Sequence, residues 1–273
     1  AFFLVIDRGD DTVKHVDTNT NTATRTYKGF GDPYGLDISP DTSFALVADG
    51  NKGIGHIDLR THQVSFPYPK EGIKGPCGVA ISPDASFALF TNSGKNNIGR
   101  IALETNKITF HYKYCGLNWP YGIAISPDSR HAVVANPNGN NIALIDLQTD
   151  EVSFPFPDAG FNKPAGVAFS PNGALVLVAN YSGNSIACID FHTRQVTFLG
   201  GFHKPTGVRS PKSLVLVLSL IYSTHETCKH FQEYSKQGIT YDSDLLVNHT
   251  LAVLYCTLEN VYMFLEYCKL GKE

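Results

Sequence analysis

One segment in the middle of the chain shows how apolar and polar positions alternate. Between residues 122 and 156, apolar runs are separated by short clusters of Ser, Pro, Asp, Asn and Gly, the residue types that form turns. The runs are four to seven residues long and lack the 3.6-residue periodicity of a helix. The predicted strands cover residues 122–126, 131–135, 141–147 and 151–156. The segment therefore predicts a sheet of four short antiparallel strands.

The same pattern recurs along most of the chain. Each copy opens on a Pro-x-Gly triplet, and successive prolines are 43, 44, 44 and 41 residues apart. Ser-Pro-Asp or a variant of it follows, and the first four copies later carry an Ile-Asp or Ile-Ala pair with a Thr three residues further on. The triplets are Pro33-Tyr34-Gly35, Pro76-Cys77-Gly78, Pro120-Tyr121-Gly122, Pro164-Ala165-Gly166 and Pro205-Thr206-Gly207. Four strands in about 40–45 residues, repeated, are typical of a β-propeller. The glycine fits the crowding of neighbouring blades near the propeller axis.

The repeats divide the chain into blades. Residues 1–32 match the last three strands of a blade, and full blades cover residues 33–75, 76–119, 120–163 and 164–204. Because a closed ring leaves no open sheet edge, we expect the missing inner strand of the first blade to come from the other end of the chain. Residues 1–208 are therefore the predicted propeller. It has five to seven blades, depending on how much of the remainder joins the ring.

Residues 209–273 depart from the pattern. Residues 213–220 still resemble a second strand, but no Asn/Gly loop or Pro-x-Gly triplet follows them. Residues 225–236 would pass for a helix, and five apolar side chains also recur at helical spacing: Leu251, Leu254, Leu258, Val261 and Leu265. Three interpretations stay open for this divergent segment, namely degenerate blades, a helical cap, or a non-native end on a truncated repeat protein.

Composition and charge exclude several classes of function. The chain has 273 residues, of which 42 % are hydrophobic and 17 % charged, so it can bury a sizeable core. A net charge of −3 argues against nucleic-acid binding, which needs clustered Lys and Arg. No apolar run approaches the roughly 18 residues of a membrane span, so no membrane insertion is predicted. We expect a monomer. The only Met is Met263, which predicts a processed or truncated N-terminal end.

The repeat motif resembles that of the YVTN-type β-propeller family. Its marks are Pro-x-Gly-(Val/Ile)-Ala-(Ile/Phe)-Ser-Pro-(Asp/Asn), then Val-Ala-Asn, then Ile-Asp-x-x-Thr-x-x-Val, nearly complete in residues 120–152 and 164–196. The resemblance covers about residues 2–208 and implies a secreted or surface-associated binding protein. Propellers host unrelated functions, so it says little about activity.

Two enzymatic relatives are also similar. Asn96-Asn97-Ile98-Gly99-Arg100-Ile101 resembles a segment of streptogramin-lyase propellers, and lactonase propellers look related in fold. The lyase resemblance implies His and Glu at the mouth of the ring, near the Pro-x-Gly triplets and the ends of the second strands. Those strand ends instead hold Asp49, Asn92, Asn136 and Asn180. No catalytic residue and no cofactor is therefore predicted.

The best candidate for a binding site is the ring of residues that follow the prolines. Fold symmetry would place Tyr34, Cys77, Tyr121, Ala165 and Thr206 around one mouth of the channel. Trp119, the only Trp, adjoins Tyr121 in sequence, and an aromatic wall with a few polar groups suits a small ligand or peptide. The predicted ligand-binding residues are Tyr34, Cys77, Trp119, Tyr121 and Thr206. Ordinary packing between blades is the alternative.

Other polar clusters have simpler interpretations. The Asn-rich loops at residues 95–97, 136–141 and 180–184 are predicted to form turns rather than a recognition surface. His225, Cys228 and His230 fall within six residues, but their spacing does not fit a helical zinc motif, so no metal is predicted. The six cysteines give no disulfide framework.

Taken together, these patterns favour a non-enzymatic propeller that binds a protein, peptide or glycan at one face of the ring. The alternative is a lactonase-like hydrolase or a streptogramin-lyase-like enzyme with its site in the central channel.

Overall fold

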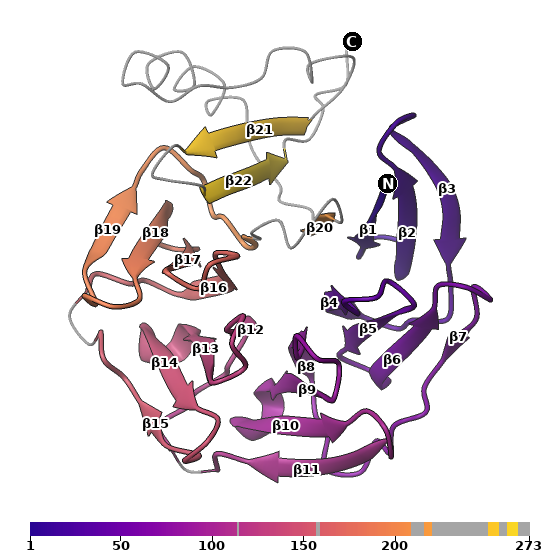
Figure 1. Cartoon of the computed structure of the whole chain (residues 1–273), viewed down its shortest axis with the longest axis horizontal. Coiled ribbons are helices and arrows are strands. Elements are labelled where there is room, and N and C mark those ends of the chain that lie inside the picture. The colour runs from indigo at the N-terminus through magenta and orange to yellow at the C-terminus, as the bar shows by residue number, and fades with distance from the viewer. Residues whose placement is uncertain (114, 157–158, 209–215, 220–250, 257–260, 267–273) are drawn as a thin grey trace.

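The fold is an all-β propeller, as the repeats predict. The computed structural model describes residues 1–113, 115–156, 159–208, 216–219, 251–256 and 261–266. Within them, five four-stranded sheets form blades arranged around a ring (Figure 1). We number the blades 1 to 5 along the chain.

Blades 2 to 5 are each built from four consecutive antiparallel strands. Blade 2 holds β4 (Pro33–Ile38), β5 (Phe44–Asp49), β6 (Gly53–Asp58) and β7 (Val64–Ser65). Blade 3 holds β8 (Pro76–Ile81), β9 (Phe87–Asn92), β10 (Asn97–Ala102) and β11 (Lys107–His111). Blade 4 holds β12 (Ile123–Ile125), β13 (His131–Asn136), β14 (Asn141–Asp146) and β15 (Val152–Ser153), and blade 5 holds β16 (Pro164–Phe169), β17 (Leu175–Asn180), β18 (Ser185–Asp190) and β19 (Val196–Leu199). Single 3₁₀ turns, η1 (Ser93–Lys95) and η2 (Pro137–Gly139), follow β9 and β13.

The strand directions give each blade two ends. At one end, which we call the upper end, the inner strand begins at its Pro-x-Gly triplet and the second strand turns into the third. At the other, the lower end, lie the Ser-Pro-Asp turn and the turn between the third and fourth strands. In blade 2, for example, Pro33 pairs with Asp49 at the upper end, and Phe44 pairs with Asp58 at the lower end. The triplets of all the blades therefore share one end of the ring.

Blade 1 is completed from the far end of the chain. Its three N-terminal strands are β1 (Phe2–Asp7), β2 (Thr12–Asp17) and β3 (Thr22–Tyr27), at the positions that the sequence predicts. β20 (Leu216–Ser219) lies beside β1 on the inner side, with Phe3 opposite Leu216. This pair is parallel, whereas the inner strands of the other four blades are antiparallel to their neighbours.

The described part of the C-terminal segment is also β-structure. β21 (Leu251–Cys256) and β22 (Val261–Glu266) form an antiparallel hairpin, drawn between blade 5 and blade 1 in Figure 1. The helical interpretation is therefore wrong for residues 251–256 and 261–266, whereas Leu258 lies outside the described residues. The residues at helical spacing are Leu and Val, and in short apolar runs such residues fit either period. Residues 225–236, including His225, Cys228 and His230, lie outside the described residues.

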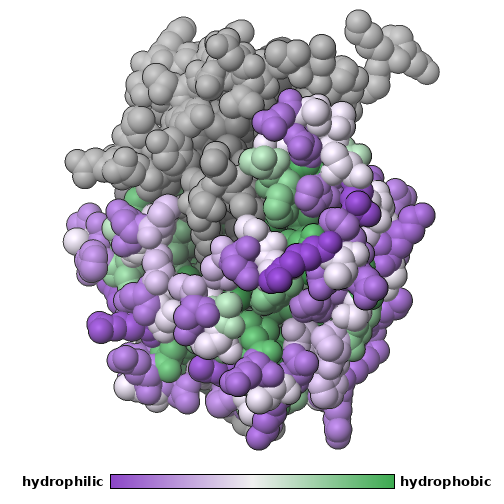
Figure 2. Space-filling model, turned by 45° about the vertical axis from the view of Figure 1, so that its right-hand side comes forward, coloured by the Kyte–Doolittle hydropathy of each residue, from purple (hydrophilic) through white to green (hydrophobic). Residues whose placement is uncertain are grey.

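The core is made between blades rather than within them. One apolar cluster joins β13 and β14 of blade 4 to β16, β17 and β18 of blade 5, and similar clusters join blade 1 to blade 2, blade 2 to blade 3 and blade 3 to blade 4. Ile57, Leu89, Ile101 and Ile145 are among the side chains with no exposed surface. Polar residues cover most of the described surface on the side that Figure 2 shows, with apolar ones visible between them.

The Ser-Pro-Asp turns at the lower end are held by side-chain hydrogen bonds. In blade 3 the Ser82 hydroxyl donates to the Asp84 carboxylate at 2.6 Å and accepts the Phe87 N–H at 3.1 Å. Ser39 and Asp41 repeat this arrangement in blade 2. These hydrogen bonds lower the pKa of Asp41 and of Asp84 from 3.8 to about 2.

The lowered pKa values predict weaker folding in acid. Because each carboxylate is bound in the folded chain, its contribution to the free energy of unfolding is fully present above pH 4 and is lost as the pH falls toward 2. Both groups are exposed, so we expect about 1 kcal/mol or less from each. Urea denaturation between pH 6 and about 2 measures the loss. In blade 5 the equivalent acceptor is Asn172, whose side chain accepts the Ser170 hydroxyl at 2.6 Å. A chain with both Asp41→Asn and Asp84→Asn should therefore fold, and it should lose less stability in acid than the wild type. An unchanged acid profile would contradict the prediction.

Candidate functional site

Close backbone contacts at the upper end gather the Pro-x-Gly triplets around one mouth. A Cβ on Gly35, Gly78, Gly122 or Gly166 would lie 2.4–2.8 Å from the carbonyl oxygen of the residue that follows the proline in the next blade. Those carbonyls belong to Cys77, Tyr121, Ala165 and Thr206. Only glycine permits this approach. The residues that follow the prolines therefore stand next to one another from blade 2 to blade 5, around the mouth that their repeat positions predict.

Buried polar side chains at the ends of the second strands fix the loops that lead into the triplets. The Asn92 side chain, with no exposed surface, accepts the Lys74 N–H at 2.6 Å and donates to the Gly72 carbonyl at 2.9 Å. Asn136 does the same with Asn118 and Gly116 in the next blade. The strand-end side chains thus hydrogen-bond to backbone groups and hold the loops that precede the triplets. These side chains are Asp49, Asn92, Asn136 and Asn180.

In blade 2 an acid replaces the amide, and a lysine supplies the missing donor. The Asp49 carboxylate accepts the N–H groups of Gly31 and Lys52 at 2.6 and 2.8 Å. A carboxylate has no N–H for the carbonyl of Gly29, the counterpart of Gly72. The Lys52 ammonium donates to that carbonyl instead, at 2.7 Å. Two different sets of side chains therefore hold the same loop geometry.

An aromatic pair forms one side of the mouth. The rings of Tyr34 and Tyr121 meet edge to face, with centroids 6.1 Å apart and planes at 89°. They come from blades 2 and 4, and Cys77 of blade 3 lies between them in the ring. Both tyrosines are half-buried, whereas Cys77 is buried. The next two positions around the ring after Tyr121 hold the small residues Ala165 and Thr206.

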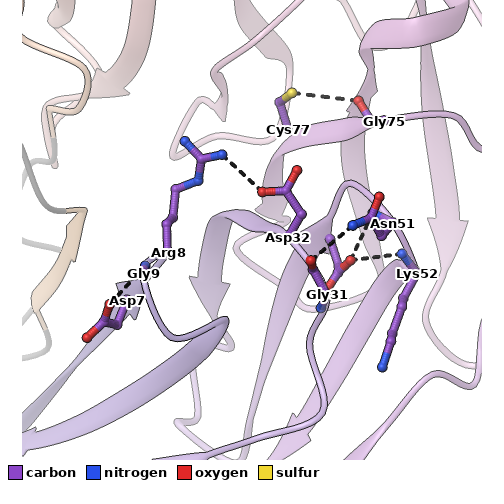
Figure 3. Close-up of polar contacts among 10 residues, drawn as sticks. Asp7, Arg8, Gly9, Gly31, Asp32, Asn51, Lys52, Gly75 and Cys77 are labelled. Carbon is purple, nitrogen blue, oxygen red and sulfur yellow. Dashed lines mark hydrogen bonds and ion pairs between the residues drawn. The ribbon is translucent and has the colours of Figure 1, made fainter.

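Arg8, in the loop between β1 and β2, closes the aromatic side. Its guanidinium carbon lies 4.0 Å from the centre of the Tyr34 ring, and its Nη2 donates to the Asp32 carboxylate at 3.0 Å. Figure 3 shows the Arg8 side chain extending toward Asp32, with Cys77 nearby. About half of the Arg8 side chain, 52 %, stays exposed. Sequence reasoning missed Arg8 and Asp32, because no other blade carries an Arg at the position of Arg8 and the repeat therefore gives no signal for it.

Burial favours the protonated forms of the phenol and thiol groups at the mouth. Burial raises the pKa of Tyr121 and of Tyr34, and it raises the pKa of the Cys77 thiol. The thiolate, not the thiol, is the nucleophile of cysteine chemistry. At neutral pH the mouth therefore presents two phenol hydroxyls, a thiol and one guanidinium, which is paired with the Asp32 carboxylate. These groups suit hydrogen bonding and packing.

The remaining predicted residues lie at the same end in different settings. Trp119 is 51 % exposed, and its backbone N–H donates to the Asn96 side chain of blade 3 at 2.7 Å. Among the described residues, no ring contact joins Trp119 to Tyr121. Thr206 is half-buried. Asn96, Asn140 and Asn184 adopt left-handed φ angles of 50–52°, as expected for turn formers, and each accepts an N–H from the start of the next blade.

Two kinds of feature are absent from the described part of the chain. No group of three or more His, Cys, Asp and Glu side chains in that part of the chain could hold a metal ion. No described helix is long and apolar enough to cross a bilayer.

Comparisons with known proteins support the fold. No protein-family model and no curated protein matches the chain. Solved structures do: a chain of a nidogen/laminin complex is 16 % identical with a TM-score of 0.65, and covers 74 % of this chain and 79 % of its own length. A functionally unknown protein from Desulfotomaculum acetoxidans is 17 % identical with a TM-score of 0.61, and covers 96 % and 78 %. Hydrazine synthase from Kuenenia stuttgartiensis is 21 % identical with a TM-score of 0.52, and covers 65 % and 52 %. At these identities the likeness establishes the β-propeller fold alone, and the YVTN-type resemblance stays a prediction.

Proposed function

We propose that this β-propeller is a non-enzymatic binding protein that captures a segment of a protein partner at its upper mouth. The observation that carries the proposal is the half-exposed Arg8 guanidinium, stacked on Tyr34 beside Tyr121. Tyr and Arg are enriched among the residues that dominate protein–protein binding energy. The propeller chain of the nidogen/laminin complex supports the proposal as a propeller found in a protein assembly.

The geometry of Arg8 defines what the partner must offer. A guanidinium has five N–H donors in a fixed plane, and Asp32 accepts from only one of its terminal nitrogens. The Tyr34 ring holds that plane in place, so the unused N–H groups have a fixed direction. A partner segment would meet them with carboxylate or carbonyl oxygens and pack an apolar group against the tyrosine pair.

Selection from a displayed library of random peptides tests this recognition. We expect the wild-type chain to enrich peptides that combine an acidic residue with an apolar one. The binding of these peptides should weaken by about 10- to 100-fold in Arg8→Gln, which keeps part of the aliphatic chain next to Tyr34 but removes the guanidinium. A similar loss is expected in the double variant Tyr34→Leu, Tyr121→Leu. Isothermal titration calorimetry measures the affinities.

Arg60→Gln provides a matched control. Arg60 also lies near an aspartate, 3.8 Å from Asp41, but at the lower end of the ring. Its replacement should leave peptide affinity unchanged. If the selected peptides bind the Arg8 and tyrosine variants as tightly as the wild type, the mouth is not their binding site.

A further inference from the structure

The outer edge of each blade is tied to the next blade by a recurring contact at the lower end. The contact is made by an aromatic residue at the end of the fourth strand or within three residues after it. This residue lies against the turn between the third and fourth strands of the following blade. In that turn His62, Asn106, Asp150 and Arg194 occupy equivalent positions 44 residues apart, all with left-handed φ angles of 56–64°. The Tyr27 hydroxyl meets His62 Nδ1 at 3.1 Å, and the Tyr112 hydroxyl donates to Asp150 at 2.6 Å. Phe156, which has no hydroxyl, lies under the Arg194 guanidinium, 5.9 Å from its ring centre.

The junction between blades 2 and 3 breaks this rule. Tyr68 and Asn106 are the corresponding pair, yet the Tyr68 hydroxyl makes no hydrogen bond to any residue that the structure describes. A groove of about 530 Å³ lies there instead, and both residues line it. Tyr68 is only 7 % exposed, but its oxygen is not among the fully buried unpaired atoms, so it keeps exposed surface on a residue that lines the groove.

The groove has a partly buried floor and a polar rim. Tyr68, Phe44 and His56 form the floor, and the His56 ring stacks on Phe44 with centroids 5.2 Å apart. Exposed side chains from both blades stand around them: Ser65, Pro67, Ser86, Glu104 and Asn106. The volume is within the range of small-molecule sites, about 300–1,000 Å³. An unpaired hydroxyl at the floor of a groove of that size is a position that a ligand can satisfy.

The chemistry of the lining selects the kind of ligand. No Lys or Arg lines the groove, which disfavours an anion, and Glu104 at the rim is its only acid. Burial lowers the pKa of His56 and raises that of Tyr68 to about 12, so both are neutral at pH 7. The hydroxyls, the Asn106 amide and the neutral imidazole each offer both a donor and an acceptor. Mixed donors and acceptors over an apolar wall match the alternating hydroxyls and C–H faces of a sugar.

We propose that the groove between blades 2 and 3 is a second binding site, for a neutral saccharide unit whose hydroxyl bridges Tyr68 and Asn106. The site is independent of the upper mouth, because its residues lie at the lower end and the outer side of the blades. It gives the propeller a recognition chemistry that the mouth does not have.

Titration of the full chain with cellobiose, maltose and N,N′-diacetylchitobiose tests the proposal. We expect at least one of these sugars to bind, as followed by saturation-transfer NMR, and Tyr68→Phe to weaken that binding about tenfold. Tyr112→Phe removes the same atom at a junction where it is already bonded, so it should leave sugar affinity unchanged. Failure of all three sugars to bind the wild type, or equal binding by Tyr68→Phe, would overturn the proposal.

Thermal unfolding gives a readout that needs no ligand. Tyr112→Phe should lower Tm by about 2–4 °C through the lost hydrogen bond to Asp150. Tyr68→Phe should leave Tm unchanged, because its hydroxyl has no partner in the described part of the chain. An equal fall in both variants would mean that the Tyr68 hydroxyl is already satisfied, which overturns the groove. Sugar binding that survives Arg8→Gln separates this site from the proposed function of the mouth.

Discussion

Replacing Gly78 by Ala is expected to lower the free energy of unfolding by about 3 kcal/mol. The added Cβ would lie 2.4 Å from the carbonyl oxygen of Tyr121 and 3.1 Å from the N of Ile123, both of which are backbone atoms of the next blade. Backbone cannot swing aside as a flexible side chain can, so the inner strands of blades 3 and 4 must separate. Urea denaturation followed by circular dichroism measures the loss.

Gly75→Asn is the control for this substitution, since it alters a glycine only three residues away. Gly75 has a left-handed φ of 54°, and the nearest atom to its Cβ position is 3.9 Å away. Trp119, Lys163 and Lys204 adopt the same φ region at the equivalent positions, and Asn tolerates that region well. We expect a change within about 0.5 kcal/mol. Equal stability of Gly78→Ala and the wild type would mean that neighbouring blades do not meet as described.

Replacing Asn92 by Leu is expected to cost a further large amount, about 3–4 kcal/mol. The Asn92 amide accepts from the Lys74 N–H and donates to the Gly72 carbonyl and, at 2.8 Å, to Asn97. Leu has a similar volume but leaves these partners facing an apolar side chain away from water. Hydrogen exchange at the Lys74 amide should quicken along with the loss of stability measured in urea.

Asn51→Leu serves as the comparison for Asn92→Leu. Asn51 is exposed, and its side-chain amide donates one hydrogen bond, to the Gly31 carbonyl at 2.9 Å. Water can replace that partner, so the expected loss is below about 1 kcal/mol. If the two variants lost the same stability, the buried amide would not be what fixes the loop before the triplet.

The sequence predicts the blades well because each strand is bounded by residues that have a local reason to be there. Ser82 and Asp84 close their own turn, and Asp58 and its counterparts accept the N–H groups two and three residues ahead. Such contacts are readable from spacing alone. The C-terminal hairpin is different, because β21 and β22 lack turn signals and their apolar residues fit two periods. Local pattern does not decide between those periods.

The candidate sites depend on contacts that spacing does not carry. Tyr34 and Tyr121 are predicted at one mouth by the repeat, but the stacking of Arg8 on Tyr34 joins the N-terminal loop to the next blade and has no counterpart in the motif. Tyr68 and Tyr112 occupy the same repeat position, yet one hydroxyl is bonded and the other faces a groove. That difference depends on whether the next blade offers Asn106 or Asp150, and on where the turn places it.

A crystal structure of the chain bound to a selected acidic peptide tests the central claim most directly. We predict that a peptide oxygen lies within hydrogen-bond distance of the Arg8 guanidinium and that an apolar group packs against Tyr34 and Tyr121. A peptide bound elsewhere, with the mouth empty and the Arg8–Asp32 pair unchanged, would contradict the claim that this mouth is the partner-binding surface of the propeller.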